Sequence, residues 1–185
     1  MRDRDDLELV TRLQDSDATA FAALIGRHTA ALRRTALAFV STGASADEVV
    51  QDTWLAVLAG LRAFEGRCSI KTWIFGILIN RAKTRGVREA RTLPVAALGD
   101  DAVACAADTP KHVLLRKELA GALAEAIGGL PDRQRAVVVL RDALGWSGDE
   151  VCGALGVTET NQRVLLHRAR SRLRTVLAGY SGRES

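Results

Sequence analysis

The stretch WSGDEVCGALGVTETNQRVLLHRAR, residues 146–170, carries the signals of two helices separated by a tight turn. Ser147 followed three residues later by Glu150 has the pattern of a capping box, which predicts a helix start directly after the serine. Gly156 permits a sharp turn at the end of that helix, and Thr158 can cap the next one. The stretch is therefore expected to form a helix-turn-helix, a motif that lays its second helix in the major groove of DNA.

The second helix, expected over residues 158–177, is rich in arginine. Arg163, near its start, is placed to reach base edges, whereas later arginines are better placed for phosphates. Because Val164, Leu165 and Leu166 are consecutive, periodicity alone does not fix the buried face. A helical hairpin with a solvated basic face has the same composition, and this alternative stays open on the segment alone.

Helical spacing of apolar residues recurs through the rest of the chain, and strand patterns are nearly absent. The spacing fades between Thr92 and Thr109, where a linker or disordered tether is expected. We therefore expect an all-α fold, with two helical domains joined by a flexible linker. The expected parts are a first domain at 1–91, a linker at 92–109, a second domain at 110–179 and a tail at 180–185. The first helix is expected near residues 5–14. Three more are expected to begin after caps at Asp17, at Ser69 and at Thr109–Pro110, the last of them ending at Gly128 and Gly129, and another is expected to begin at about Ala46. The final three helices are expected over 132–142, 148–155 and 158–177.

The 185 residues carry a net charge of +4, and basic residues cluster in two places, Arg62–Arg91 and Arg163–Arg174. Two basic patches indicate two contacts with a polyanion, although the excess of arginine over lysine can also follow from genomic base composition. No apolar run is long enough to cross a bilayer and no signal peptide is visible, so a cytoplasmic protein is expected. The three cysteines are odd in number and widely spaced, which favours reduced thiols, and no metal-ligand spacing or cofactor motif is present.

Two stretches resemble the extracytoplasmic-function (ECF) family of bacterial RNA polymerase sigma factors. ADEVVQDTWLAVLAGLRAFEGRCSIKTWIFGILINRAKTR, residues 46–85, resembles their second conserved region, and residues 130–174 resemble the fourth. The resemblance implies a protein that is not an enzyme, binds bacterial core RNA polymerase, and directs promoter-specific initiation through the −35 and −10 elements. It also implies promoter DNA, the β′ clamp helices, the β flap and an anti-sigma factor as partners.

The resemblance places three sets of site residues on this chain. The set expected to dock on core polymerase is Asp47, Glu48, Val50, Gln51, Asp52 and Leu55. The set expected to engage the −10 element, by holding an extruded base and the single strand, is Phe64, Gly66, Arg67, Ser69, Lys71, Asn80, Arg81, Lys83 and Arg85. The set expected to engage the −35 element is Thr158, Thr160, Asn161, Arg163, Val164, His167, Arg168 and Arg170.

The chain also departs from the family pattern. Gln162 stands where an apolar core residue is usual, and Val164 and Leu165 stand where polar or basic residues are usual. Glu159 either accepts a hydrogen bond from cytosine or repels phosphate. Thr84 replaces a common aspartate.

Some residues of the first domain have two interpretations. Trp54 is expected to pack the domain rather than dock a partner, and Trp73 to lie in the core rather than stack on a base. Cys68 is expected to be a small unreactive residue, with a redox role as the alternative.

Two other functions are compatible with parts of the sequence. A stand-alone helix-turn-helix regulator would use the same C-terminal motif, but its N-terminal domain is not expected to match a docking helix followed by a basic loop. A nucleic-acid hydrolase would need a phosphate-binding loop, a metal constellation or a nucleophile–base pair, and none of these motifs is visible.

Overall fold

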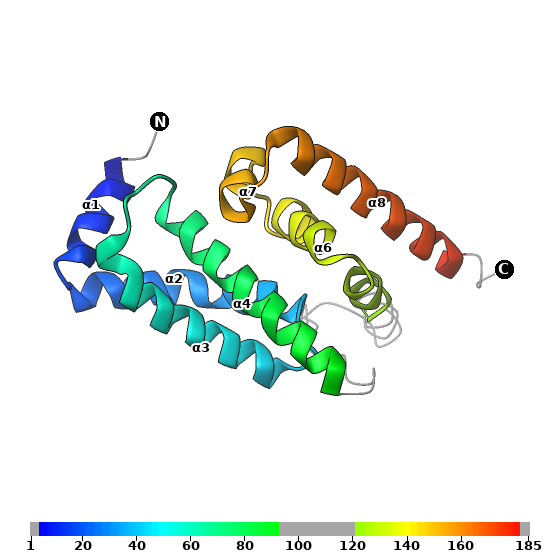
Figure 1. The fold of residues 1–185 in the computed structure, drawn as a ribbon, viewed down its shortest axis with the longest axis horizontal. Coiled ribbons are helices and arrows are strands. Elements are labelled where there is room, and N and C mark those ends of the chain that lie inside the picture. The colour runs from blue at the N-terminus through cyan, green and yellow to red at the C-terminus, as the bar shows by residue number, and fades with distance from the viewer. Residues whose placement is uncertain (1–3, 93–120, 182–185) are drawn as a thin grey trace, which may run out of the picture.

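The computed structural model describes residues 4–92 and 121–181, and every regular element within them is a helix (Figure 1). The expected all-α class is therefore confirmed. Apart from Thr92, the expected linker lies outside the described residues, as does the cap expected at Thr109 and Pro110.

The N-terminal half contains α1 (Arg4–Gln14), α2 (Ala18–Leu37), α3 (Gly43–Gly60), the 3₁₀ turn η1 (Leu61–Ala63) and α4 (Ile70–Thr92). Side chains cap these helices where the sequence predicts them. An Asp17 carboxylate oxygen accepts hydrogen bonds from the backbone N–H groups of Thr19 at 2.9 Å and Ala20 at 3.0 Å. The Ser69 hydroxyl accepts one from the N–H of Thr72 at 3.1 Å.

The start of α3 differs from the prediction. The helix begins at Gly43 rather than near Ala46, because Thr42 takes the capping position and accepts a hydrogen bond from the Ser45 N–H at 3.1 Å. A threonine at this position satisfies a backbone donor that the first turn leaves free.

In the C-terminal half, residues 121–128 are helical and end at the predicted pair of glycines. The helix expected over 132–142 is instead α6 (Asp132–Val138) followed by a π-helical turn, η2 (Val139–Ala143). The wider turn is closed by a hydrogen bond from the Leu144 N–H to the Val139 carbonyl at 3.1 Å. The turn ends shortly before Trp146, whose N–H donates to the Leu140 carbonyl at 3.0 Å.

The predicted helix-turn-helix is formed by α7 (Gly148–Leu155) and α8 (Glu159–Ser181). Ser147 and Glu150 make the expected capping box, with each side chain accepting from the backbone N–H of the other. Gly156 has the left-handed conformation, φ 61°, that the turn requires. The Thr158 hydroxyl accepts from the Asn161 N–H at 3.3 Å.

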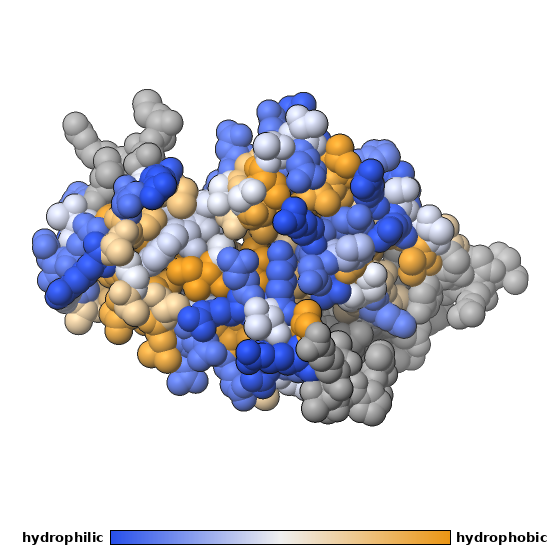
Figure 2. All heavy atoms as spheres, viewed as in Figure 1, coloured by the Kyte–Doolittle hydropathy of each residue, from blue (hydrophilic) through white to orange (hydrophobic). Residues whose placement is uncertain are grey.

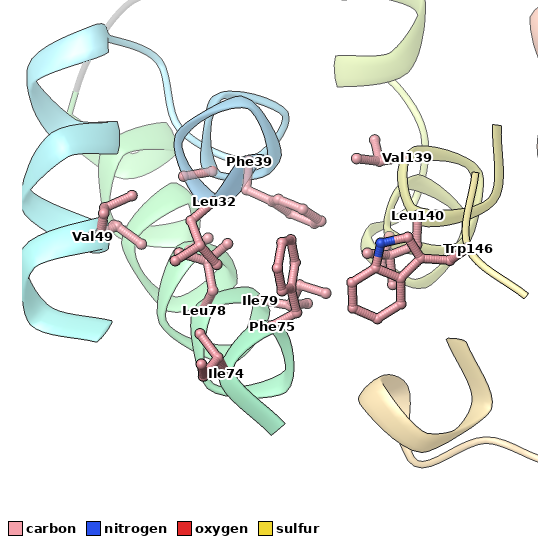
Figure 3. Packing of buried hydrophobic residues seen from close by; sticks show 14 of the residues in the cluster. Leu32, Phe39, Val49, Ile74, Phe75, Leu78, Ile79, Val139, Leu140 and Trp146 are labelled. Atoms are coloured by element: carbon pink, nitrogen blue, oxygen red, sulfur yellow. The ribbon is translucent and has the colours of Figure 1, made fainter. Parts of the chain in front are cut away.

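The two halves pack against each other along α4 and α7, and one buried hydrophobic cluster includes residues from both (Figures 1 and 3). Phe75 of α4 faces Trp146 edge-on across this contact, with ring centroids 4.7 Å apart. Glycines let the helices approach closely. A Cβ on Gly76 would lie 3.1 Å from the Ala154 carbonyl oxygen, and one on Gly153 would lie 3.1 Å from a methyl group of Thr72.

Candidate protein-binding and DNA-binding surfaces

A groove of about 390 Å³ runs between α2 and α3, and we call it the docking groove. Leu55 and Leu58 of α3 border it and are 60% and 57% exposed, which is unusual for leucine. Hydrophobic atoms reach the surface over the α3 side of the molecule (Figure 2). The groove is lined by Phe21, Ile25, Thr29, Asp47, Val50, Gln51, Trp54, Leu55 and Leu58.

The residues expected to dock on polymerase lie at or beside this groove. Val50 is buried, whereas the side chains of Gln51 and Asp52 are exposed. Asp47 pairs with Arg33 at 2.8 Å, and Glu48 pairs with Arg85 of α4 at 2.7 Å. An apolar centre with an acidic border suits a basic partner surface.

The sequence prediction missed the second wall of the groove. Phe21 and Ile25 come from α2, and Leu58 follows Leu55 by one helical turn. Trp54 is buried, and its indole N–H donates to the Thr29 hydroxyl at 3.2 Å, which agrees with the packing role expected for it.

The loop before α4 carries the first residues expected at the −10 element. Gly66 adopts φ 62°, a left-handed conformation that favours glycine. Phe64 is 8% exposed and packs on half-buried Trp73, with ring centroids 4.9 Å apart, so its ring is covered in this conformation. Arg67 is exposed and pairs with Glu65 at 2.5 Å. Ser69 is occupied as the cap of α4.

Lys71, the next expected −10 residue, contacts the other half of the molecule. Its ammonium group pairs with Glu150 of α7 at 3.0 Å and lies 4.3 Å from the ring centroid of Trp146. Burial raises the pKa of Glu150, but the hydrogen bond from the Ser147 N–H and the pair with Lys71 outweigh it, so the pKa lies below its ordinary value. Lys71 is thus held by contacts within the chain.

The remaining −10 candidates on α4 fall into two groups. Asn80 and Arg81 are exposed. Burial lowers the pKa of the half-buried Lys83. The hydrogen bond to Glu89 and the nearby Glu48 raise the pKa of the Arg85 guanidinium, which lies between these two carboxylates.

The structure fixes which side of α8 is buried. Gln162, Leu166, Ala169 and Leu173 are each less than a tenth exposed and recur at helical spacing. We call the opposite, exposed side the recognition face, and it consists of Thr160, Val164, His167 and Arg168.

Other −35 candidates flank the recognition face. Arg163 pairs with Glu159 one turn earlier on α8. Arg170 pairs with Asp142 of η2 at 2.6 Å, and this hydrogen-bonded pair raises the pKa of Arg170. Arg170 therefore braces α8 against η2, whereas His167 and Arg168 are open to solvent.

Two further findings concern the parts of the chain that the structure describes. These parts hold no group of three or more His, Cys, Asp or Glu side chains that could bind a metal ion. Nor does any helix within them have the length and apolar composition to cross a membrane. Cys68 and Cys152 are partly exposed and not disulfide-bonded, and burial raises the pKa of Cys152. Cys105 lies outside the described residues.

A helix-turn-helix with exposed basic residues, together with a separate apolar groove, is typical of a DNA-binding protein that also binds a protein partner. Residues 24–92 match the family model for Sigma-70 region 2, and residues 120–173 match the model for Sigma-70, region 4. The chain is 34% identical to the ECF RNA polymerase sigma factor SigM of Mycobacterium tuberculosis, over 96% of this chain and 87% of SigM. The chain belongs to the ECF family of RNA polymerase sigma factors, which direct RNA polymerase to promoters.

Solved structures agree with this assignment. The structure of CnrH in complex with the cytosolic domain of CnrY superposes with a TM-score of 0.74, at 26% identity, covering 94% of this chain and 97% of CnrH. The sigma factor RpoE of Bartonella quintana, solved with the anti-sigma factor NepR, has the same fold. Its TM-score is 0.64 at 24% identity, covering 85% of this chain and 96% of RpoE.

Proposed function

We propose that this sigma factor holds core RNA polymerase with the docking groove, reads the −35 element with the recognition face, and engages the −10 element with the loop and helix at residues 64–85. The assignment divides the chain into a polymerase-binding and −10 domain at 1–91, a linker at 92–109, and a −35 domain at 110–179. The protein acts as a non-catalytic subunit in the cytoplasm.

The observation that carries this proposal is the exposure of Leu55 and Leu58 on α3, a helix that lies on the other side of α4 from α8 (Figure 1). Two exposed leucines beside carboxylates are suited to a protein partner rather than to DNA. One chain can therefore bind polymerase through α3 while α8 lies on DNA. The match of residues 24–92 to Sigma-70 region 2 favours this assignment over a stand-alone regulator.

The contact between α4 and α7 constrains how the −10 residues are used. Lys71 is paired with Glu150 and lies over the ring of Trp146, and movement of α7 away from α4 would release it from both contacts to bind DNA. The same movement frees the surface around Gly76. We infer that the two halves part when the sigma factor joins polymerase and promoter.

An anti-sigma factor is proposed as a further partner. CnrH, which is similar to this chain over nearly its whole length, was solved with the cytosolic domain of CnrY. A chain of the same fold offers a comparable surface for a cytosolic regulatory domain.

Reconstitution with bacterial core polymerase tests the proposal. The wild-type chain is expected to bind core, and substitution of Leu55 and Leu58 together by aspartate is expected to abolish binding by placing charges in the dry centre of the contact. Leu123→Asp, at a leucine that is 41% exposed on the other half, is the matched control and should bind normally. Equal binding by all three proteins would contradict the docking assignment.

A further inference from the structure

Val164 lies at the centre of the recognition face. Its side chain is 40% exposed, whereas Leu166 is 9% exposed and Leu165 is half-buried, so it is the member of this apolar triplet that points outward. Thr160 is one helical turn before it, and Arg168 is one turn after it on the same side. A duplex whose major groove receives the centre of this face has Val164 against its bases.

A valine at this position restricts which base edges the recognition face can contact favourably. It has no hydrogen-bond donor or acceptor, and its branched Cβ holds both methyl groups in a narrow range of positions. Base edges with polar atoms lose water against it without gaining a partner. The apolar feature of the major groove is the C5-methyl group of thymine, which apolar side chains contact.

We propose that Val164 reads a thymine methyl group within the −35 element, an inference that rests on the proposed role of α8 as the −35 reader. Thr160, His167 and Arg168 surround the contact and can bind neighbouring base edges or phosphates. Arg163 pairs with Glu159, and Val164 remains 40% exposed beside this pair.

The test uses the full chain bound to core polymerase. Preferred promoter duplexes are first selected from a library with a randomised −35 element, and each thymine of the −35 element is then replaced by deoxyuridine, which lacks the methyl group. One position is expected to lose affinity about fourfold, the effect of exposing one buried methyl group. Placing 5-methylcytosine instead of cytosine at that position should strengthen binding by a similar factor.

Variants connect the effect to the residue. Val164→Ala should bind thymine and deoxyuridine at that position equally. The matched control, Val176→Ala, changes a valine of α8 that is 45% exposed and lies three turns further along, and it should keep the fourfold difference. Both variants remove the same atoms from the same helix.

The possible outcomes distinguish a failure of the proposed role of Val164 from a failure of the proposed function. If no duplex is selected, or selection is identical with core polymerase alone, the proposed function fails. If duplexes are selected but no thymine is sensitive to loss of its methyl group, the function stands and the role of Val164 is overturned. The role is also overturned if the sensitivity persists in Val164→Ala.

Discussion

The two candidate DNA-binding surfaces differ in how far the fold covers them. On α8, the recognition face is open from Thr160 to Arg168. At the start of α4, Phe64 is packed under Trp73, and Lys71 is paired with Glu150. Each half contributes exposed basic residues, such as Arg81 and Arg168, but the N-terminal half also holds Lys71 against the other half of the molecule.

This difference shows that a cationic residue in a DNA-binding motif is not automatically available to DNA. Arg168 is exposed, whereas Lys71 and Arg170 already have carboxylate partners, Glu150 and Asp142. Pairs of this kind cost little to exchange for phosphate when they are solvent-exposed. Lys71 additionally lies over Trp146 at the contact between the two halves, and the proposed separation of α4 and α7 would release it.

The largest effect is expected for a substitution at Gly86, where α4 packs against the chain that follows α2. A Cβ on Gly86 would lie 2.1 Å from the Phe39 carbonyl oxygen, so Gly86→Ala forces the end of α2 away from α4. The free energy of unfolding should fall by about 3 kcal/mol in urea denaturation, since overpacking against rigid backbone is not relieved by a rotamer change. Gly26→Ala in α2, where an added Cβ meets no neighbouring element of the described structure within 4 Å, is the control and should be neutral or stabilising. Similar losses for both variants would contradict the close packing of α2 and α4.

Three arginine substitutions on α8 sharpen the comparison for the exposed surface. Arg163→Ala is expected to relax discrimination at one or two −35 positions by about 1–3 kcal/mol, whereas Arg168→Ala should weaken binding evenly across sequences. Arg170→Ala should affect DNA binding least, because Arg170 braces η2 through Asp142. Binding of a panel of −35 variants by the polymerase complex measures all three. Identical losses on every site for Arg163→Ala and Arg168→Ala would contradict this arrangement of α8.

A substitution at the contact between α4 and α7 tests whether this contact holds the two halves together. Gly76→Ala places a methyl group 3.1 Å from the Ala154 carbonyl oxygen and should weaken the closed arrangement by about 1–2 kcal/mol. The radius of gyration in small-angle scattering is expected to rise as more molecules part. Gly121→Ala, at which an added Cβ meets none of the described residues within 4 Å, should leave the scattering unchanged. An unchanged radius for Gly76→Ala would mean that the close approach of α4 and α7 does not hold the halves together.

The smallest effect is expected for the Lys71–Glu150 pair, whose side chains are both about a third exposed. A double-mutant cycle with Lys71→Met and Glu150→Gln should give a coupling of about 0.5 kcal/mol. The pKa of Glu150 is lowered in the folded chain, so the contribution is complete above its ordinary pKa of 4.5 and is lost as the pH falls through the lowered value. A coupling that is unchanged at acidic pH would exclude an ionic contribution.

Local signals in the sequence predict much of this fold. The caps at Asp17, Ser69 and Ser147 mark helix starts because each side chain satisfies backbone donors within its own first turn. Capping is a short-range interaction and is therefore readable from a few residues. The π-helical turn at η2 was not predictable, because its apolar run is equally compatible with a continuous α-helix.

The register of α8 and the contact between the halves depend on distant residues. Gln162 is 3% exposed although it is polar, because it packs near the start of α7, with its Oε1 3.9 Å from the place of a Cβ on Gly148. Its buried Nε2 has no hydrogen-bond partner among the described residues, so no local rule favours this placement. Gly76 and Gly153 likewise show no local sequence signal, because the close helix approach that requires a glycine at each position involves a residue distant in the sequence.

The most direct test is a disulfide bond between the loop before α4 and α7, which would prevent the two halves from separating. A Cβ on Gly153 would lie 4.0 Å from the Cβ of Cys68, within the range of a disulfide, so Gly153→Cys can be oxidised to lock the halves together. The measurement is promoter-specific transcription with core polymerase, before and after reduction, with Cys68→Ser combined with Gly153→Cys as the variant that cannot form this bridge. We predict transcripts from the reduced protein and from the control, and almost none from the oxidised protein. Equal transcription by oxidised and reduced protein would contradict the proposed parting of the two halves.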